Sequence, residues 1–287
     1  MNKFPLKSYI ELTKPSITAL VLVTTVLGFY CAQGNLHHPW LLLWTLLGSA
    51  LSCAGASVLN QYLERDADAL MNRTRRRPLP SGTISPERAL SFGIILVLSG
   101  LVVLCWKVNI LTAFLSLLTC FLYVLVYTPM KKMSWLNTTI GAIPGAIPPM
   151  GGWAAAANGL DLGAGVLFLI LFAWQHPHFY AIAWMFKEDY KKAGFKMLPV
   201  VYPDGKMTLA QIMAFSFALI GFSLMPSMTG MAGKFYFWGA LTLGALPLYY
   251  AGVFQREQSV LNARKILLAS VVYLPLLLGL IVIDGIL

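Results

Sequence analysis

Apolar residues fill long stretches of this chain, and short polar segments separate them. A run of about 20 apolar residues allows a helix to cross the roughly 30 Å hydrocarbon layer of a bilayer. Nine such runs lie near residues 16–33, 40–63, 87–106, 108–127, 137–157, 162–186, 207–230, 235–254 and 266–286. The pattern predicts an all-α integral membrane protein with nine transmembrane helices.

The composition supports this interpretation. Of the 287 residues, 58% are hydrophobic and only 11% are charged, which excludes an ordinary soluble domain with a charged surface. No polar segment is long enough to fold alone, so we expect residues 1–287 to form a single transmembrane domain. Two longer connections, near 64–86 and 187–206, are the expected functional loops.

The basic residues predict the orientation of the helices. Lysine and arginine are retained on the cytoplasmic side when loops are short. With nine spans, the N-terminus and the loops after the second, fourth, sixth and eighth spans share one side, and only Lys107 and Lys234 of the 21 basic residues fall on the other. We therefore expect the N-terminus inside and the C-terminus outside. The net charge of +10 is explained by topology and requires no nucleic acid partner.

A proline-rich segment within one apolar run has two possible interpretations. The segment GAIPGAIPPMGGW, residues 141–153, places three prolines within an apolar run. Such a helix either lines an interior space or is kinked for packing, because proline removes a backbone donor. His37 and His38 fall in a short outer loop and receive no role.

The charge is concentrated in NQYLERDADALMNRTRRRPLP, residues 60–80. Asn60, Glu64 and Asp68 are four residues apart and share one helical face. Carboxylates one turn apart repel each other and favour a bound cation, and oxygen donors alone favour a hard ion such as Mg²⁺. The alternative is a solvated helix end. Asp66 points elsewhere and is expected to pair with Arg65 or a neighbouring arginine.

Four arginines follow, at positions 73, 75, 76 and 77. Guanidinium groups suit phosphate oxygens. Beside a metal they predict a diphosphate site, whereas alone they would be read as positive charge that sets the topology.

These residues resemble the N-x-x-x-D-x-x-x-D motif of the UbiA-type intramembrane prenyltransferases, in the form typical of the protohaem IX farnesyltransferase (haem O synthase) branch. Further matches are LTKP at 12–15, YTPMKK at 127–132, WQHPHFYAIAW at 174–184 and KEDYKKAGFKMLPVV at 187–201. The resemblance covers most of the chain. Glu64 stands where the family usually has aspartate, and His176 where it often has methionine.

The resemblance implies a bundle around a central cavity that opens to the cytoplasmic side, with Mg²⁺ as cofactor. Asn60, Glu64 and Asp68 would hold the metal and act in catalysis together with Asp189. The implied substrate-binding residues are Arg73, Arg77, Tyr127, Lys131, Gln175, His178, Phe179 and Lys187.

The resemblance also implies the reaction. A farnesyl group would pass from farnesyl diphosphate to a vinyl group of haem B, with addition of water, to give haem O. The protein would lie in a bacterial cytoplasmic membrane with its active side facing the cytoplasm, and a haem A synthase is a candidate partner. Alternatives are a quinone precursor or chlorophyll as prenyl acceptor, or a transporter, which would need polar groups near the bilayer midplane.

Overall fold

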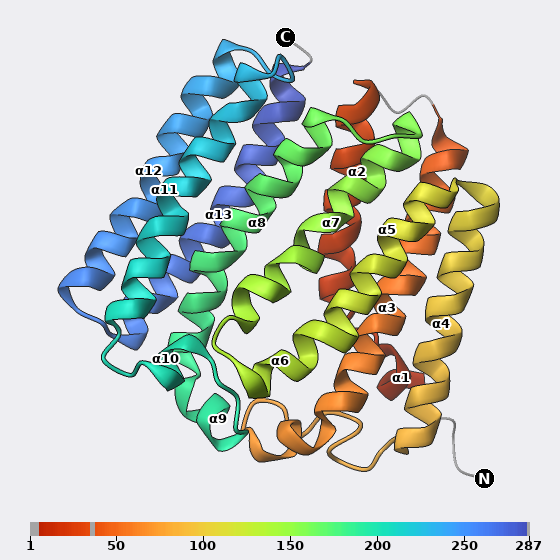
Figure 1. Cartoon of the computed structure of the whole chain (residues 1–287), viewed down its shortest axis with the longest axis vertical. Helices are drawn as coiled ribbons and strands as arrows, with labels where there is room; N and C mark the ends of the chain where they lie inside the picture. The colour runs from red at the N-terminus through yellow and green to blue at the C-terminus, as the bar shows by residue number, and fades with distance from the viewer. Residues whose placement is uncertain (1–5, 35–37, 286–287) are drawn as a thin grey trace.

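The regular secondary structure of the protein is helical throughout residues 6–34 and 38–285, which a computed structural model describes. Lys3 and His37 lie outside these residues. Within them, each of the nine apolar segments is helical (Figure 1). Eight are α2 (Pro15–Gln33), α3 (Pro39–Leu70), α4 (Pro86–Lys107), α7 (Asn137–Ala157), α8 (Leu162–Met185), α11 (Lys206–Met228), α12 (Lys234–Arg256) and α13 (Val260–Asp284). The other joins α5 (Ile110–Phe121), the π-helix η1 (Leu122–Tyr127) and α6 (Thr128–Met133).

Eight helical segments in the described ranges are long and apolar enough to cross a membrane. The segment outside that set is α7, in which glycines and prolines replace larger apolar side chains. Large apolar side chains also face outward, for example Ile95 and Trp106 on α4, as expected where helices meet hydrocarbon. The all-α membrane fold is confirmed, whereas the count of nine spans and their orientation stay predictions.

Polar side chains begin several of the helices. Ser85 accepts a hydrogen bond from the backbone N–H of Arg88 at the start of α4, and Asp161 accepts one from Gly163 at the start of α8. Such caps satisfy N–H groups that have no partner within the helix.

The two long connections differ from the ranges expected. Helix α3 continues beyond the apolar run to Leu70, so the first connection begins only at residue 71. The Thr74 hydroxyl donates to the Asp68 carbonyl oxygen at 2.8 Å and satisfies a backbone acceptor in the last turn. The second connection contains two short helices, α9 (Lys187–Lys192) and α10 (Leu198–Val201). The acidic motif therefore lies on a helix.

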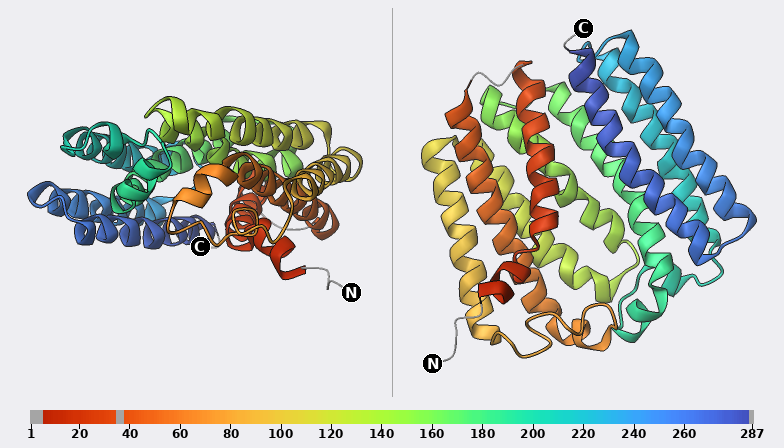
Figure 2. Two further views of the ribbon diagram at one scale, coloured as in Figure 1. Left: turned by 90° about the horizontal axis from the view of Figure 1, so that it is seen from below. Right: turned by 180° about the vertical axis from the view of Figure 1, so that it is seen from behind.

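These connections gather at one end of the bundle (Figures 1 and 2). The connection after α3 lies beside α6, α9 and α10, at the same end as the N-terminus, and the C-terminus lies at the opposite end. A short helix, α1 (Leu6–Leu12), precedes α2 at the N-terminal end. The polar motifs are thus brought together at one end.

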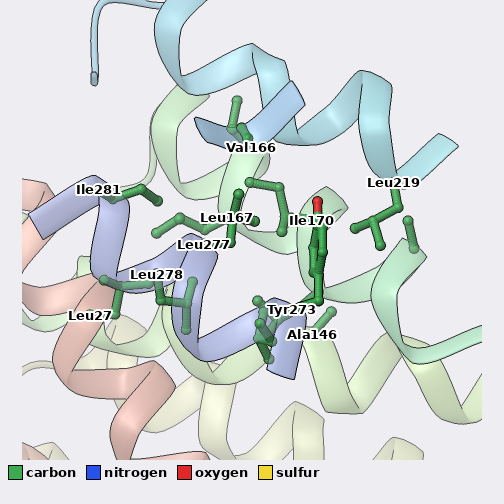
Figure 3. Close-up of a cluster of buried hydrophobic side chains, with 14 of the residues drawn as sticks. Leu27, Ala146, Val166, Leu167, Ile170, Leu219, Tyr273, Leu277, Leu278 and Ile281 are labelled. Atoms are coloured by element: carbon green, nitrogen blue, oxygen red, sulfur yellow. The ribbon is translucent and has the colours of Figure 1, made fainter. Parts of the chain in front are cut away.

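The largest buried apolar cluster surrounds α8 (Figure 3). Val166, Leu167 and Ile170 of α8 meet Leu277 of α13 and Leu27 of α2, and all are buried. Between helices in a membrane, association relies on van der Waals packing because lipid chains are as apolar as these side chains. This cluster fixes α8, which carries the WQHPHF segment.

Helices α2 and α7 approach so closely that glycine is required at their contact. A Cβ atom on Gly152 would overlap the Thr25 carbonyl oxygen, and one on Gly28 would overlap the Pro149 carbonyl oxygen. Small residues allow this approach between membrane helices. The prolines of α7 stay within a continuous helix.

We predict that Gly152→Ala destabilises the protein by about 1–3 kcal/mol, because the added methyl group forces the α2 and α7 backbones apart. Thermal unfolding in detergent measures the effect. Gly151→Ala is the matched control, since a Cβ there meets no atom within 4 Å. Equal melting temperatures for the two variants would contradict the close contact.

Candidate active site

One face of α3 presents three oxygen-bearing side chains to the protein interior. Asn60, Glu64 and Asp68 are 1%, 6% and 1% exposed. Their spacing of four residues places them one above another on the helix. Asp66 is exposed, and its carboxylate lies 3.8 Å from Arg65, which confirms the expected pairing. The three oxygen donors therefore point away from lipid and share one buried region.

Each oxygen donor meets a cation from a different segment. Lys14 Nζ donates to Asn60 Oδ1 at 2.9 Å, Lys131 Nζ lies 2.6 Å from Glu64 Oε1, and Arg77 donates to Asp68 Oδ2 at 2.8 Å. We call these six residues the charge ladder. It joins the start of α2, helix α6 and the connection after α3 to one face of α3.

Lys14 enters the ladder through an unusual backbone conformation. Its φ of 48° and ψ of 66° are left-handed, a region that non-glycine residues rarely occupy. The Gln61 side chain donates to the Leu12 carbonyl at 2.7 Å and so ties this segment to α3. Burial, together with the positive charge of Arg77, lowers the pKa of Lys14 to about 8.

Lys131 lies between aromatic rings as well as beside Glu64. Its ammonium nitrogen is 4.7 Å from the centre of the Tyr127 ring and 5.6 Å from that of Phe195. These are cation–π distances. The backbone N–H of Lys196 donates to the Lys131 carbonyl at 2.7 Å, which fastens α6 to the second connection.

Hydrogen bonds connect Asn60 to the junction of the π-helix η1 and α6. Asn60 Nδ2 donates to the Thr128 hydroxyl at 2.9 Å, and that hydroxyl donates to the Tyr123 carbonyl at 2.8 Å. A π-helix inserted in an α-helix often marks a functional site. The chain of hydrogen bonds fixes the orientation of the Asn60 amide, with its oxygen toward Lys14.

The two connections are joined by Asp189. Its carboxylate accepts from the Arg73 backbone N–H at 3.3 Å and from Asn72 Nδ2 at 3.4 Å. The Arg73 guanidinium donates to the Tyr190 hydroxyl at 3.1 Å and lies 4.9 Å from the centre of the Phe186 ring. Asp189 thus lies against Arg73, which belongs to the same connection as Arg77.

The donor set fits a hard divalent cation. Asp68 Oδ1 is buried without a hydrogen-bond partner, and an isolated buried carboxylate oxygen is costly. Amide and carboxylate oxygens are the ligands that Mg²⁺ favours. The ladder offers two carboxylates and one amide oxygen to such an ion. Across residues 6–34 and 38–285, no cluster of three or more His, Cys, Asp or Glu side chains forms an alternative metal site.

The remaining expected site residues lie on or just after α8 and have separate contacts. Gln175 is buried and donates to the Ala142 carbonyl of α7 at 3.1 Å. His178 Nδ1 lies 2.8 Å from the Ser270 hydroxyl of α13, and Phe179 is 38% exposed. Lys187, the first residue of α9, lies 4.8 Å from the centre of the Trp184 ring.

His176 belongs to the core. It is fully buried and its ring stacks on that of Phe215, with 3.4 Å between the ring centroids. Its Nδ1 lies 2.7 Å from the Phe172 carbonyl oxygen. Its side chain and that of His178 serve different helix contacts, although only one residue separates them.

Sequence reasoning placed the oxygen donors, Lys131 and Arg77 in one site, and the structure brings them together. It missed Lys14, which was counted as a topological charge. The available signal was LTKP, where a lysine immediately precedes the proline that starts a span.

The chain is similar to known proteins over most of its length. The sequence pattern of the UbiA prenyltransferase family matches residues 21–273. A protoheme IX farnesyltransferase of Solibacter usitatus (strain Ellin6076) is 47% identical, over 97% of this chain and 99% of the relative. That of Aquifex aeolicus (strain VF5) is 39% identical, over 97% and 95% of the two chains.

Solved structures share the fold. One described as digeranylgeranylglyceryl phosphate synthase has a TM-score of 0.82 with 21% identity, covering 98% of each chain. A UbiA homologue from Archaeoglobus fulgidus bound to GPP and Mg²⁺ has a TM-score of 0.68 with 18% identity, covering 96% of this chain and 99% of the homologue.

We predict strong coupling between Glu64 and Lys131, whose side chains are 7% and 13% exposed. Lys131→Met leaves a buried carboxylate without its cation and should cost about 3 kcal/mol of unfolding free energy. Glu64→Gln combined with Lys131→Met should cost less than the two single changes together. Unfolding in detergent measures all four proteins, and additivity within about 0.5 kcal/mol would refute a buried ion pair.

Proposed function

Because the chain belongs to the UbiA prenyltransferase family and resembles protoheme IX farnesyltransferases over nearly its full length, we propose that it transfers the farnesyl group of farnesyl diphosphate to a vinyl group of haem B. Water completes the addition, and the product is haem O. The single structural observation that carries this proposal is the charge ladder, where buried oxygen donors and cations converge at one end of an apolar bundle.

The ladder residues suit the departure of a diphosphate. Asn60, Glu64 and Asp68 would hold Mg²⁺, which supplies positive charge toward the leaving group when bound. Breaking the allylic carbon–oxygen bond leaves negative charge on the diphosphate, so groups that stabilise this charge accelerate the step. Burial of the three oxygen donors lowers the local dielectric, which strengthens these electrostatic interactions.

The basic residues would bind the diphosphate oxygens. Arg77 and Lys131 already reach the acidic face, and Arg73 lies at the junction of the two connections. Asp189 orients the backbone around Arg73 and adds a carboxylate from the second half of the chain. The Tyr127 ring beside Lys131 offers a π-face to positive charge that develops on the prenyl carbon.

The α8 residues are proposed to bind haem B. The Ser270 hydroxyl donates its proton to the Leu267 carbonyl at 2.7 Å, so it accepts from His178 Nδ1. This tautomer leaves Nε2 of His178 with a lone pair for the iron or a haem propionic acid. Gln175 would orient the porphyrin, Phe179 would contact its apolar surface, and Lys187 would pair with a propionate.

The chemistry is proposed to face the cytoplasm of a bacterium. The ladder lies at the end of the bundle that carries the basic connections, and these are retained on the cytoplasmic side of a membrane. Both substrates combine a lipophilic body with anionic groups, which suits a site between hydrocarbon and cytosol. A haem A synthase that consumes haem O is the proposed partner.

We predict that Asp68→Asn reduces haem O formation at least about a hundredfold, because it removes a carboxylate that balances the metal's charge. The protein should still accumulate in the membrane. Asp66→Asn is the matched control, since the Asp66 side chain is 83% exposed and lies off the ladder. Mass spectrometry of haems from cells that express each variant measures the product.

Normal haem O levels in the Asp68→Asn variant would contradict the role of the ladder. The acceptor is tested separately with purified wild-type protein, farnesyl diphosphate and either haem B or 4-hydroxybenzoate. If the protein prenylates 4-hydroxybenzoate and forms no haem O, haem B is rejected as the acceptor, but the protein remains a prenyltransferase.

A further inference from the structure

The three oxygen donors on α3 are already occupied by cations of the protein. Lys14, Lys131 and Arg77 carry three positive charges, and Glu64 and Asp68 carry two negative charges, so the ladder has an excess of one positive charge. A divalent metal that arrived alone would raise this excess to three in a buried region. Like charges in low dielectric repel strongly, so the metal alone is disfavoured.

A diphosphate changes this balance. It brings negative oxygens that can take over the displaced lysine and arginine groups while the metal binds α3. Cations that leave Glu64 and Asp68 then keep an anionic partner, as buried charges require. Metal and diphosphate should therefore favour each other's binding, and this coupling is reciprocal.

Lys14 occupies the one side-chain oxygen that Asn60 can offer to a metal. The Asn60 amide nitrogen is bound to Thr128, so Oδ1 is the atom of this side chain that a metal could use. That oxygen accepts from Lys14. Unlike the carboxylates, Asn60 has no second oxygen to offer. A metal on Oδ1 would lie beside the Lys14 ammonium group, and repulsion between the two cations favours movement of Lys14.

The backbone supports an active role for Lys14. A left-handed conformation at a lysine costs energy, and the residue before a proline is normally extended. Strain of this kind persists where the surrounding structure holds a group in place. Here the Gln61–Leu12 hydrogen bond and the buried Leu12 side chain hold the segment against α3.

We propose that Lys14 is an exchangeable counter-ion, which holds Asn60 in the substrate-free protein and moves to the diphosphate when substrate binds, so that a divalent metal binds tightly only together with a diphosphate. This inference rests on the proposed function in treating the ladder as a metal–diphosphate site. It adds a substrate-binding residue and an order to assembly, and it is independent of the prenyl acceptor.

The test uses the purified full chain in detergent, with Mn²⁺ and inorganic pyrophosphate as probes. Electron paramagnetic resonance of free Mn²⁺ gives the affinity for the metal alone, and equilibrium dialysis of labelled pyrophosphate, with and without excess Mn²⁺, gives the coupling. In the wild type, Mn²⁺ should strengthen pyrophosphate binding by about tenfold or more. Lys14→Met should bind Mn²⁺ alone about tenfold more tightly and should lose most of the coupling.

Two further variants separate charge from backbone effects. Lys14→Gly removes the same charge and tolerates the left-handed conformation, so it should reproduce the Lys14→Met result and remains usable if that variant misfolds. Lys14→Met combined with Asn60→Leu should lose the gained Mn²⁺ affinity, because the released amide oxygen is gone. Lys7→Met is the matched control, since Lys7 is exposed on the neighbouring helix α1.

The inference is overturned if wild-type protein binds pyrophosphate with equal affinity with and without Mn²⁺, or if removal of Lys14 changes the affinity for Mn²⁺ alone no more than Lys7→Met does. These outcomes are distinct from failure of the proposed function. Haem O formation without coupling would remove only the counter-ion role. Coupling without haem O formation would leave that role standing and reject haem B as the acceptor.

Discussion

Charged side chains inside an apolar bundle need partners, and this requirement organises the polar end of the protein. Asn60, Glu64 and Asp68 stand on one face of α3, and their three cations come from the start of α2, from α6 and from the connection after α3. Pairing these groups fixes the segments relative to one another. Buried ion pairs contribute little net stability compared with apolar packing, so stability alone does not account for a ladder of this kind.

The helical segments and the oxygen face could be predicted because both follow from local periodicity. Apolar runs predict the spans, and a spacing of four residues places Asn60, Glu64 and Asp68 together on a helix of any tertiary structure. The role of Lys14 could not be predicted in this way, since it pairs with Asn60 across 46 positions. Only the folded backbone, with its left-handed turn at Lys14, brings the two together.

Helix α8 shows the same limit at shorter range. His176 and His178 are near neighbours in the sequence, but residues two apart on a helix point to different sides. His176 stacks on Phe215 in α11, and His178 meets Ser270 in α13. The sequence shows that the two directions differ, and only the packing of α11 and α13 shows which histidine retains polar chemistry.

The contact between α2 and α7 also limits how reactants reach the interior. Gly28 and Gly152 bring the two backbones together without intervening side chains, and their neighbours on the opposite helix are carbonyl groups. A flexible isoprenoid tail or a flat macrocycle cannot slip through such a seam. The α2–α7 side of the bundle is therefore closed to lipophilic molecules from the bilayer.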